Sequence, residues 1–259
     1  MGVRINTNIE ALNAQRNLSM TGVSFGKSVE KLSSGLRINR AADDAAGLAI
    51  SEKLRAQVRG LNQACRNAQD GISMVQTAEG ALNEVHSMLQ RIRELAVQYA
   101  NGTNDSDSQA SISSEVSQLQ SAIVDIGTNT KFNGVSLLSG GATVNFQVGA
   151  DQGQTLSVTF GAVDTSAASV SDISTVDTAI ASISTLRGTF GAAQNRLEHT
   201  VASLAVASEN LAASESRIRD LDVANEMVNF TKTQILQQAG TAILAQANQA
   251  PQSILSLLR

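Results

Sequence analysis

The sequence predicts a mainly α-helical protein, in which long, rod-like helices form an antiparallel, coiled-coil-like bundle with a small β-hairpin insert. Three observations lead to this prediction. Apolar residues recur at helical spacing over most of the 259 residues. Aromatic residues make up only 3% of the chain, while small side chains that suit close helix packing are abundant. One stretch, at about residues 143–160, alternates apolar and polar residues as β-strands do.

The first expected element is a helix from about residue 6 to residue 33. Its apolar stripe is less regular than those of the later helices, but it keeps roughly helical spacing. The residues of this stripe are Ile9, Leu12, Val23, Phe25, Val29 and Leu32.

The second helix carries the clearest apolar pattern of the chain. Apolar positions follow one another in steps of three or four residues, about 3.5 on average, which is typical of helices packed with a left-handed supercoil. Asp43 and Asp44 stand where an N-cap and first turn favour acids, and Asn101-Gly102 supplies an end. At about 84 Å this helix would exceed the width of a compact globule, so we expect an elongated molecule. The stripe consists of Leu54, Val58, Leu61, Cys65, Ala68, Ile72, Val75, Ala78, Leu82, Val85, Leu89, Ile92, Ala96 and Tyr99.

A third helix fits the apolar spacing from Ile112 to Ile126. The hairpin follows a turn-rich stretch, FNGVSLLSGG, and a loop of small and hydroxyl residues follows the hairpin. A last long helical pattern begins near Ile173 and continues through Leu221 towards the C-terminus. The alternating residues of the hairpin are Val144, Phe146 and Val148, then Leu156, Val158 and Phe160.

The C-terminal tail has no charged residue between Lys232 and Arg259. Apolar residues recur along it at helical spacing, and glutamine fills many of the positions between them. We expect the first and last helices to lie antiparallel. Two paired helices bury too little surface to offset the entropy lost when they become ordered. The sequence therefore predicts that other copies of the chain cover this pair. The tail residues assigned to such contacts are Ile235, Leu236, Ile243, Leu244, Ile254, Leu255 and Leu257.

Composition argues against several functions. A net charge of −4 does not favour nucleic-acid binding by the whole chain. The sequence shows neither a cleavable signal nor a long apolar run. We therefore expect neither secretion with a cleaved signal peptide nor a membrane span. The sequence also lacks phosphate-binding glycine motifs, and its two histidines, His86 and His199, are far apart. We therefore expect no catalytic residue, cofactor or metal site, and we interpret Cys65 as a buried small hydrophobe rather than a reactive thiol.

Several long stretches closely resemble bacterial flagellin. They include LSSGLRINRAADDAAGLAISEKLR, RNAQDGISMVQTAEGALNEV and LQRIRELAVQYANGTN in the first half, and SESRIRDLDVANEM and FTKTQILQQAGTAILAQANQAPQSILSLLR at the C-terminal end. They occur in the family's order and span nearly the whole chain. The chain resembles a minimal flagellin without large outer domains.

This resemblance implies a structural subunit that polymerises into the flagellar filament used for motility. By analogy, residues 1–43 and 220–259 form an inner coiled-coil domain, and residues 44–219 form a helical rod domain with the hairpin. The family's partners would be other copies of the chain, an export chaperone that binds the apolar tail, and the filament cap and junction proteins. The expected location is the extracellular filament, reached by type III export.

The resemblance also implies recognition by the toll-like innate receptor for flagellin. The matching positions are Arg91 and Leu95, in an RxRELA context, and Glu115 in the next helix. Because this surface lies between subunits in flagellar filaments, recognition would require released monomers. Spacing alone is equally consistent with a solvated helix edge carrying an ion pair between Arg91 and Glu94. Two departures from the family are Cys65 and Arg40, each at a position that commonly carries a small residue.

Two alternatives to a filament subunit remain at this point. One is a hook-filament junction-type protein of the same appendage, which shares terminal helices but is present in few copies. The other is a membrane-active amphipathic protein, which would insert its tail into lipid surfaces. The glutamines of the tail argue against the second, because amides are costly to bury in lipid.

Overall fold

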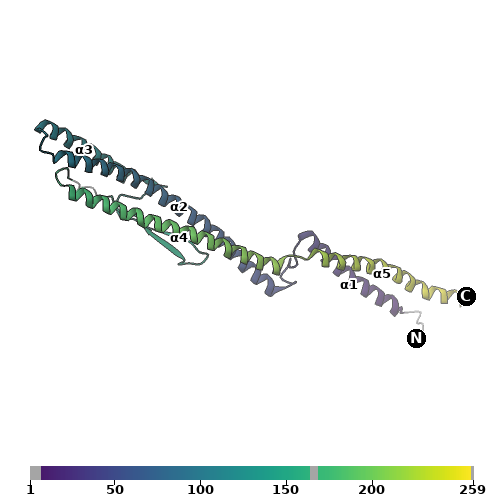
Figure 1. Cartoon of the computed structure of the whole chain (residues 1–259). Helices are drawn as coiled ribbons and strands as arrows, with labels where there is room; N and C mark the ends of the chain where they lie inside the picture. The colour runs from purple at the N-terminus through teal and green to yellow at the C-terminus, as the bar shows by residue number, and fades with distance from the viewer. Residues whose placement is uncertain (1–6, 164–168, 258–259) are drawn as a thin grey trace. The chain divides into compact units, whose positions relative to one another are not determined.

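The computed structural model describes residues 7–163 and 169–257, with side chains as far as residue 249. The described helices are α1 (Ile9–Ser34), α2 (Ala45–Tyr99), α3 (Ser106–Asn129), α4 (Ile173–Arg219) and α5 (Val223–Leu257) (Figure 1). Two antiparallel strand pairs complete the described part, β1 (Lys131–Phe132) with β2 (Val135–Ser136), and β3 (Thr143–Gln147) with β4 (Thr155–Thr159). The predicted mainly α-helical class with a β-hairpin insert is confirmed.

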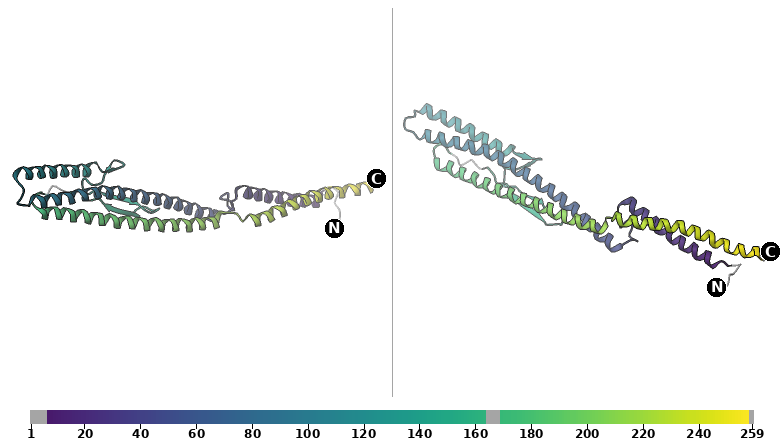
Figure 2. Two further views of the ribbon diagram at one scale, coloured as in Figure 1. Left: turned by 45° about the horizontal axis from the view of Figure 1, so that its top comes forward. Right: turned by 45° about the vertical axis from the view of Figure 1, so that its right-hand side comes forward.

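Contacts along the chain separate two compact units. The central unit comprises Ala56–Asn210, and the terminal unit comprises Met1–Arg55 together with Leu211–Arg259. Helices α2 and α4 each contribute residues to both units. In the central unit α3 and α4 run alongside α2, as all views agree (Figures 1 and 2).

The core of the central unit is built on the predicted stripe of α2. Every position of that stripe is buried or half-buried, and none is exposed. Val75, Leu82 and Leu89 have no exposed surface, and helices α3 and α4 contribute the facing apolar side chains. The periodicity near 3.5 therefore identified the buried face correctly. Cys65 is half-buried rather than fully buried, whereas Ala64 beside it and Ala68 on the next turn are fully buried.

The β3–β4 hairpin lies where the alternating pattern predicted it. Val144 pairs with Val158 and Phe146 with Leu156, and β4 turns Leu156 and Val158 into the core. Glycine allows the close approach to α2, since a Cβ atom at Gly71 would stand 3.1 Å from the ring of Phe146. Phe160, just after β4, packs its ring 5.3 Å from that of Phe190 on α4.

The short pair β1–β2 is an element that the sequence predicted only as a turn-rich stretch. Asn133 and Gly134, at φ values of 47° and 81°, form its turn. Both central residues therefore have positive φ, as a type I′ hairpin turn requires. The Asn-Gly pair was the available signal, but strands of two residues leave too little alternation to detect.

In the terminal unit α1 lies beside α5 with opposite chain direction (Figure 2). Near one end of the pair the side-chain amide of Asn8 donates to the carbonyl of Ala247 at 2.7 Å. Further along, the rings of Phe25 and Phe230 stack 5.1 Å apart. The predicted antiparallel pairing of the terminal helices is thus confirmed.

One expectation about the last helix was wrong. The apolar pattern predicted a single helix from Ile173 through Leu221 towards the C-terminus, but the chain leaves the helix at Asp220 and starts α5 at Val223. The carboxylate of Asp222 caps the new helix by accepting hydrogen bonds from the backbone N–H groups of Ala224 and Asn225, at 3.0 and 3.2 Å. Apolar spacing continues across the break, so the pattern could not reveal it.

Candidate functional site

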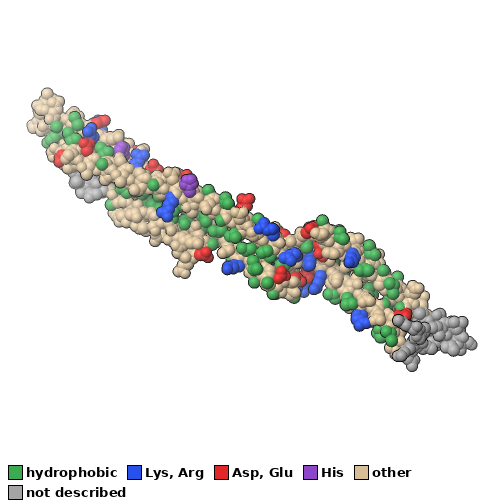
Figure 3. All heavy atoms as spheres, turned by 60° about the horizontal axis from the view of Figure 1, so that its bottom comes forward, with side chains coloured by type: hydrophobic (Ala, Val, Ile, Leu, Met, Phe, Trp, Pro, Cys, Tyr) green, Lys and Arg blue, Asp and Glu red, His purple; other side chains and the backbone are tan. Residues whose placement is uncertain are grey.

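The terminal helix pair exposes an unusual amount of apolar surface for a folded chain. Single exposed apolar residues are ordinary on protein surfaces, whereas a contiguous set marks an interaction site. Along α5 Val228 is 68% exposed and Ile235 is 59% exposed. Figure 3 shows hydrophobic side chains spread over the surface formed by α1 and α5. Among the side chains that the structure describes, the exposed large apolar residues of the pair are Ile9, Leu12, Met20, Val23 and Val29 on α1, and Val223, Met227, Val228, Ile235, Leu236 and Ile243 on α5.

Part of this surface forms an open groove on α5 of about 550 Å³. Its floor is almost entirely apolar, and Lys232 is the charged residue in its lining. The remaining lining residues are Met227, Val228, Thr231, Ile235 and Leu236; Val228, Thr231 and Ile235 follow in steps of three and four residues along one helix face, and Met227 and Leu236 adjoin them. Such a row of anchors is what a second helix with an apolar face can cover.

The predicted tail residues divide into three groups. Ile235, Leu236 and Ile243 are exposed in the single chain. Leu244 is half-buried against the helix pair. Ile254, Leu255 and Leu257 have side chains outside the described residues.

A second predicted site lies on the central unit, where α2 meets α3. The guanidinium of Arg91 donates to the carboxylate of Glu115 through Nε at 3.1 Å and through Nη2 at 3.0 Å, and Nη1 reaches Glu94 at 3.1 Å. Hydrogen bonding to Glu115, followed by Glu94, raises the pKa of Arg91. The structure therefore brings Arg91 and Glu115 together, and it also contains the predicted ion pair between Arg91 and Glu94.

Leu95 lies in a different environment from Arg91, although only one helical turn separates them. Half of the Arg91 side chain is exposed, whereas Leu95 is only 2% exposed and belongs to the core of the central unit. Of the three residues assigned to receptor contact, Arg91 and Glu115 lie on the surface and Leu95 is buried in the core.

The residues considered for chemistry have ordinary surroundings. His86 is half-buried and lies 2.9 Å from the side-chain amide of Gln90, while His199 is exposed beside an open hollow on α4. Within residues 7–163 and 169–257, His, Cys, Asp and Glu side chains form no group suited to a metal ion. In the same part of the chain, no helix combines the length and apolarity needed to cross a bilayer.

Comparison with known protein families shows where this architecture belongs. Residues 5–143 match the bacterial flagellin N-terminal helical region, and residues 173–258 match the bacterial flagellin C-terminal helical region. The chain belongs to the bacterial flagellin family. The two matched regions contain α1 to α3 and α4 to α5, with the hairpin at their junction.

Full-length relatives agree with this assignment. The chain is 53% identical over 270 residues to a flagellin of Halalkalibacterium halodurans, a match that covers 98% of this chain and 99% of the relative. It is 49% identical over 284 residues to the flagellar filament 33 kDa core protein of Treponema phagedenis, with the same coverage of both chains. The crystal structure of Bacillus cereus flagellin is similar to 58% of this chain and 94% of its own, at 32% identity and a TM-score of 0.50. The chain is therefore a structural subunit of a flagellar filament.

Proposed function

We propose that the terminal helix pair is the inner domain through which copies of this subunit polymerise. The observation that carries the proposal is the apolar face of α1 and α5, which the chain itself leaves uncovered. Burying an apolar side chain contributes about 1.5–3 kcal/mol, so several half-exposed residues per copy supply a strong drive to associate. A contact between two different faces can repeat from copy to copy, and when its rotation does not close into a ring the repetition builds a helical filament.

In this proposal residues 1–43 and 220–259 are the inner domain, and residues 44–219 are the rod domain. The compact terminal unit extends further into α2 and α4 than this division. Ion pairs join α2 and α4 in this region, since Arg55 reaches Glu215 at 2.8 Å and Arg219 reaches Glu52. The first turns of α2 and the last turns of α4 would then belong to the inner domain.

The proposal is tested by seeding purified subunits with filament fragments and imaging the products. Deletion of residues 240–259 removes part of the α5 face and should leave folded subunits that do not elongate the seeds. A matched control is Val124→Gln, which changes an exposed apolar side chain on α3 of the central unit. Filaments of normal form grown from the deletion variant would contradict the role given to α5.

Assembly through an apolar tail implies partners that protect it beforehand. The same face would need cover in the cell, and an export chaperone that binds α5 fits that need. Export without a cleaved signal through the flagellar type III apparatus, assembly beneath a filament cap, and attachment to junction proteins complete the proposed route to an extracellular filament. Coexpression of a flagellar chaperone with the full chain should protect α5 amides from hydrogen exchange, and unchanged exchange would count against this step.

We further propose that released monomers are ligands of the toll-like innate receptor for flagellin, through the Arg91–Glu115 pair. The pair is exposed and spans two helices, so it offers a defined surface with alternating charge. Arg91→Ala should weaken binding to the receptor ectodomain. Arg93→Ala is the matched control, because Arg93 pairs with Asp177 of α4 instead. Equal losses from both variants would refute the assignment.

The role proposed here is mechanical, with no catalytic step. A junction-type protein of the same appendage is less well supported, since relatives named as filament core proteins align over 98% of this chain. Abundance separates the two roles, because a filament subunit should dominate material sheared from cells. A membrane-active role predicts binding of the chain to anionic vesicles, which the filament proposal does not require.

A further inference from the structure

The break between α4 and α5 lies in a stretch that has no helix-breaking residue. From Ala192 to Ala239 the sequence contains neither glycine nor proline, and these two residues are the usual signals for a helix end. Helix α1 ends in the ordinary way, with Gly35 in the left-handed conformation at φ 71°. The end of α4 therefore needs a different cause.

That cause is a cap supplied by the connector between α1 and α2. The backbone N–H of Arg37 donates to the carbonyl of Arg219 at 2.7 Å. The Arg37 guanidinium donates through Nε, at 3.1 Å, and through Nη2 to the carbonyl of Ile218. The last carbonyls of a helix have no partner within it, and a cation there is favoured by the helix dipole. One residue thus satisfies two of these carbonyls.

The polypeptide beyond α4 is held out of the helix by the same connector. Leu36 and Asp220 form an antiparallel bridge, and the N–H of Leu221 donates to the carbonyl of Gly35 at 3.0 Å. In a continuous helix the N–H of Leu221 would instead bond to the carbonyl four residues earlier. The connector therefore replaces a helical hydrogen bond at the point where the helix stops.

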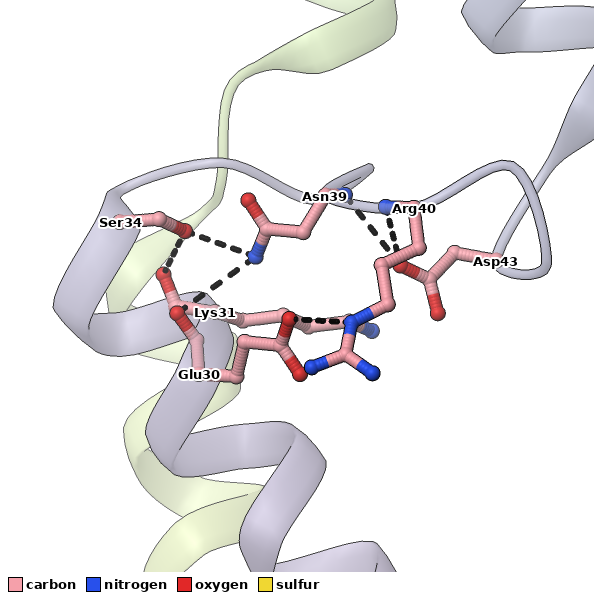
Figure 4. A network of polar contacts seen from close by, with 6 residues as sticks. All are labelled: Glu30, Lys31, Ser34, Asn39, Arg40 and Asp43. Atoms are coloured by element: carbon pink, nitrogen blue, oxygen red, sulfur yellow. Dashed lines mark hydrogen bonds and ion pairs between the residues drawn. The ribbon is translucent and has the colours of Figure 1, made fainter.

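The connector can act as a cap because it is fixed by its own contacts (Figure 4). The carboxylate of Asp43 accepts hydrogen bonds from the N–H groups of Asn39 and Arg40, at 3.2 and 3.0 Å, and the bond from Arg40 is the main cause that lowers the pKa of Asp43. The guanidinium of Arg40 also pairs with Glu30 of α1 at 2.8 Å, but this ion pair is largely exposed and contributes little. The bonds to Asp43 come from backbone N–H groups of the connector, so they hold Arg37 in place without help from α4 or from the Arg40 side chain.

We infer that Arg37 is a positioning residue that imposes the break between α4 and α5 and so sets the register of α5 against α1. Without this cap, the residues from α4 into α5 continue as one helix. Each residue added to a helix turns the following side chains by about 100°, so filling the break would rotate the α5 face and separate the stacked rings of Phe25 and Phe230. The inference rests on the proposed role of the α1–α5 pair only for its effect on assembly.

The test measures the backbone conformation of the break directly. Subunits carrying Arg37→Ala are labelled with ¹³C and ¹⁵N and copolymerised with an excess of unlabelled, unsubstituted subunits. The Cα chemical shifts of Asp220, Leu221 and Asp222 are then read by solid-state NMR. The matched control is Arg40→Ala, which removes an exposed guanidinium from the same connector without touching α4.

We expect non-helical Cα shifts in the unsubstituted chain and in the Arg40→Ala control, and helical shifts in Arg37→Ala. A glycine at the exposed position 220 supplies a helix end that does not depend on Arg37, so Arg37→Ala combined with Asp220→Gly should restore the non-helical shifts. If Arg37→Ala subunits fail to enter filaments, the inference requires that Asp220→Gly restores their entry. Non-helical shifts in Arg37→Ala, or no rescue by Asp220→Gly, would overturn it. Polymer yield reports on the assembly surface and Cα shifts report on the break, so the two proposals can fail separately.

Discussion

Replacing Ile235 and Ile243 with glutamine tests how much the uncovered face of α5 contributes to assembly. The two side chains are 59% and 57% exposed in the single chain. If neighbouring copies bury the remaining surface, each isoleucine contributes about 1–1.5 kcal/mol, because full burial is worth about 1.5–3 kcal/mol. The double variant should therefore lose about 2–3 kcal/mol of association free energy per subunit, and its critical concentration should rise roughly 30- to 150-fold.

The assay is seeded elongation, followed by measurement of the subunit concentration that remains free at equilibrium. Circular dichroism before seeding should be unchanged, because exposed substitutions usually alter folding stability by less than about 0.5 kcal/mol. Val124→Gln, on α3, serves as the control for a general effect of surface polarity. A critical concentration close to that of the unsubstituted chain would refute burial of this face.

Three further predictions concern the central unit. Gly71→Leu forces a side chain into the ring of Phe146, 3.1 Å from the position of the new Cβ, and should lower the free energy of unfolding by about 1–3 kcal/mol in urea titrations; an unchanged midpoint would contradict the close docking of the hairpin. Gly80 has open space around it, so Gly80→Ala should stabilise α2 by about 0.5–1 kcal/mol in the same assay. A loss of stability would contradict the placement of Gly80 inside a helix with room for a methyl group. Hydrogen bonds from Ser108 lower the pKa of Asp105, the N-cap of α3, below 3.8. This cap therefore stabilises the fold above pH 3.8, and its contribution disappears as the pH falls through the lowered pKa. Thermal melts of Asp105→Asn between pH 2 and pH 6 should accordingly show a weaker loss of stability on acidification, and identical slopes would count against the cap.

Much of the central unit was predictable because local patterns determine it. The stripe of α2 repeats over many turns, and a long repeat at constant spacing has few competing interpretations. The strands β3 and β4 alternate strictly, which identified both the hairpin and its buried face. The burial of Leu95 was not evident, because its spacing from Arg91 is compatible with a shared exposed face.

The α4–α5 break escaped prediction for a physical reason. The Arg37 side chain that caps α4 lies 181 positions from its acceptor, Ile218, and a contact at such separation leaves no local signal. Asp222 is a local signal for the start of α5, since aspartate favours N-caps, but the apolar spacing continues on both sides of it. Short-range sequence rules detect a helix end only when the chain supplies its own cap.

Burial of the α1–α5 pair between copies can be measured as the solvent accessibility of α5 before and after polymerisation. A single thiol is placed on α5 by Val228→Cys, at a side chain that is 68% exposed, in a Cys65→Ser background, and its rate of alkylation is measured in subunits and in filaments. The account predicts rapid labelling of subunits and strong protection in filaments. Equal labelling rates in both states would contradict the burial of the terminal helix pair between copies.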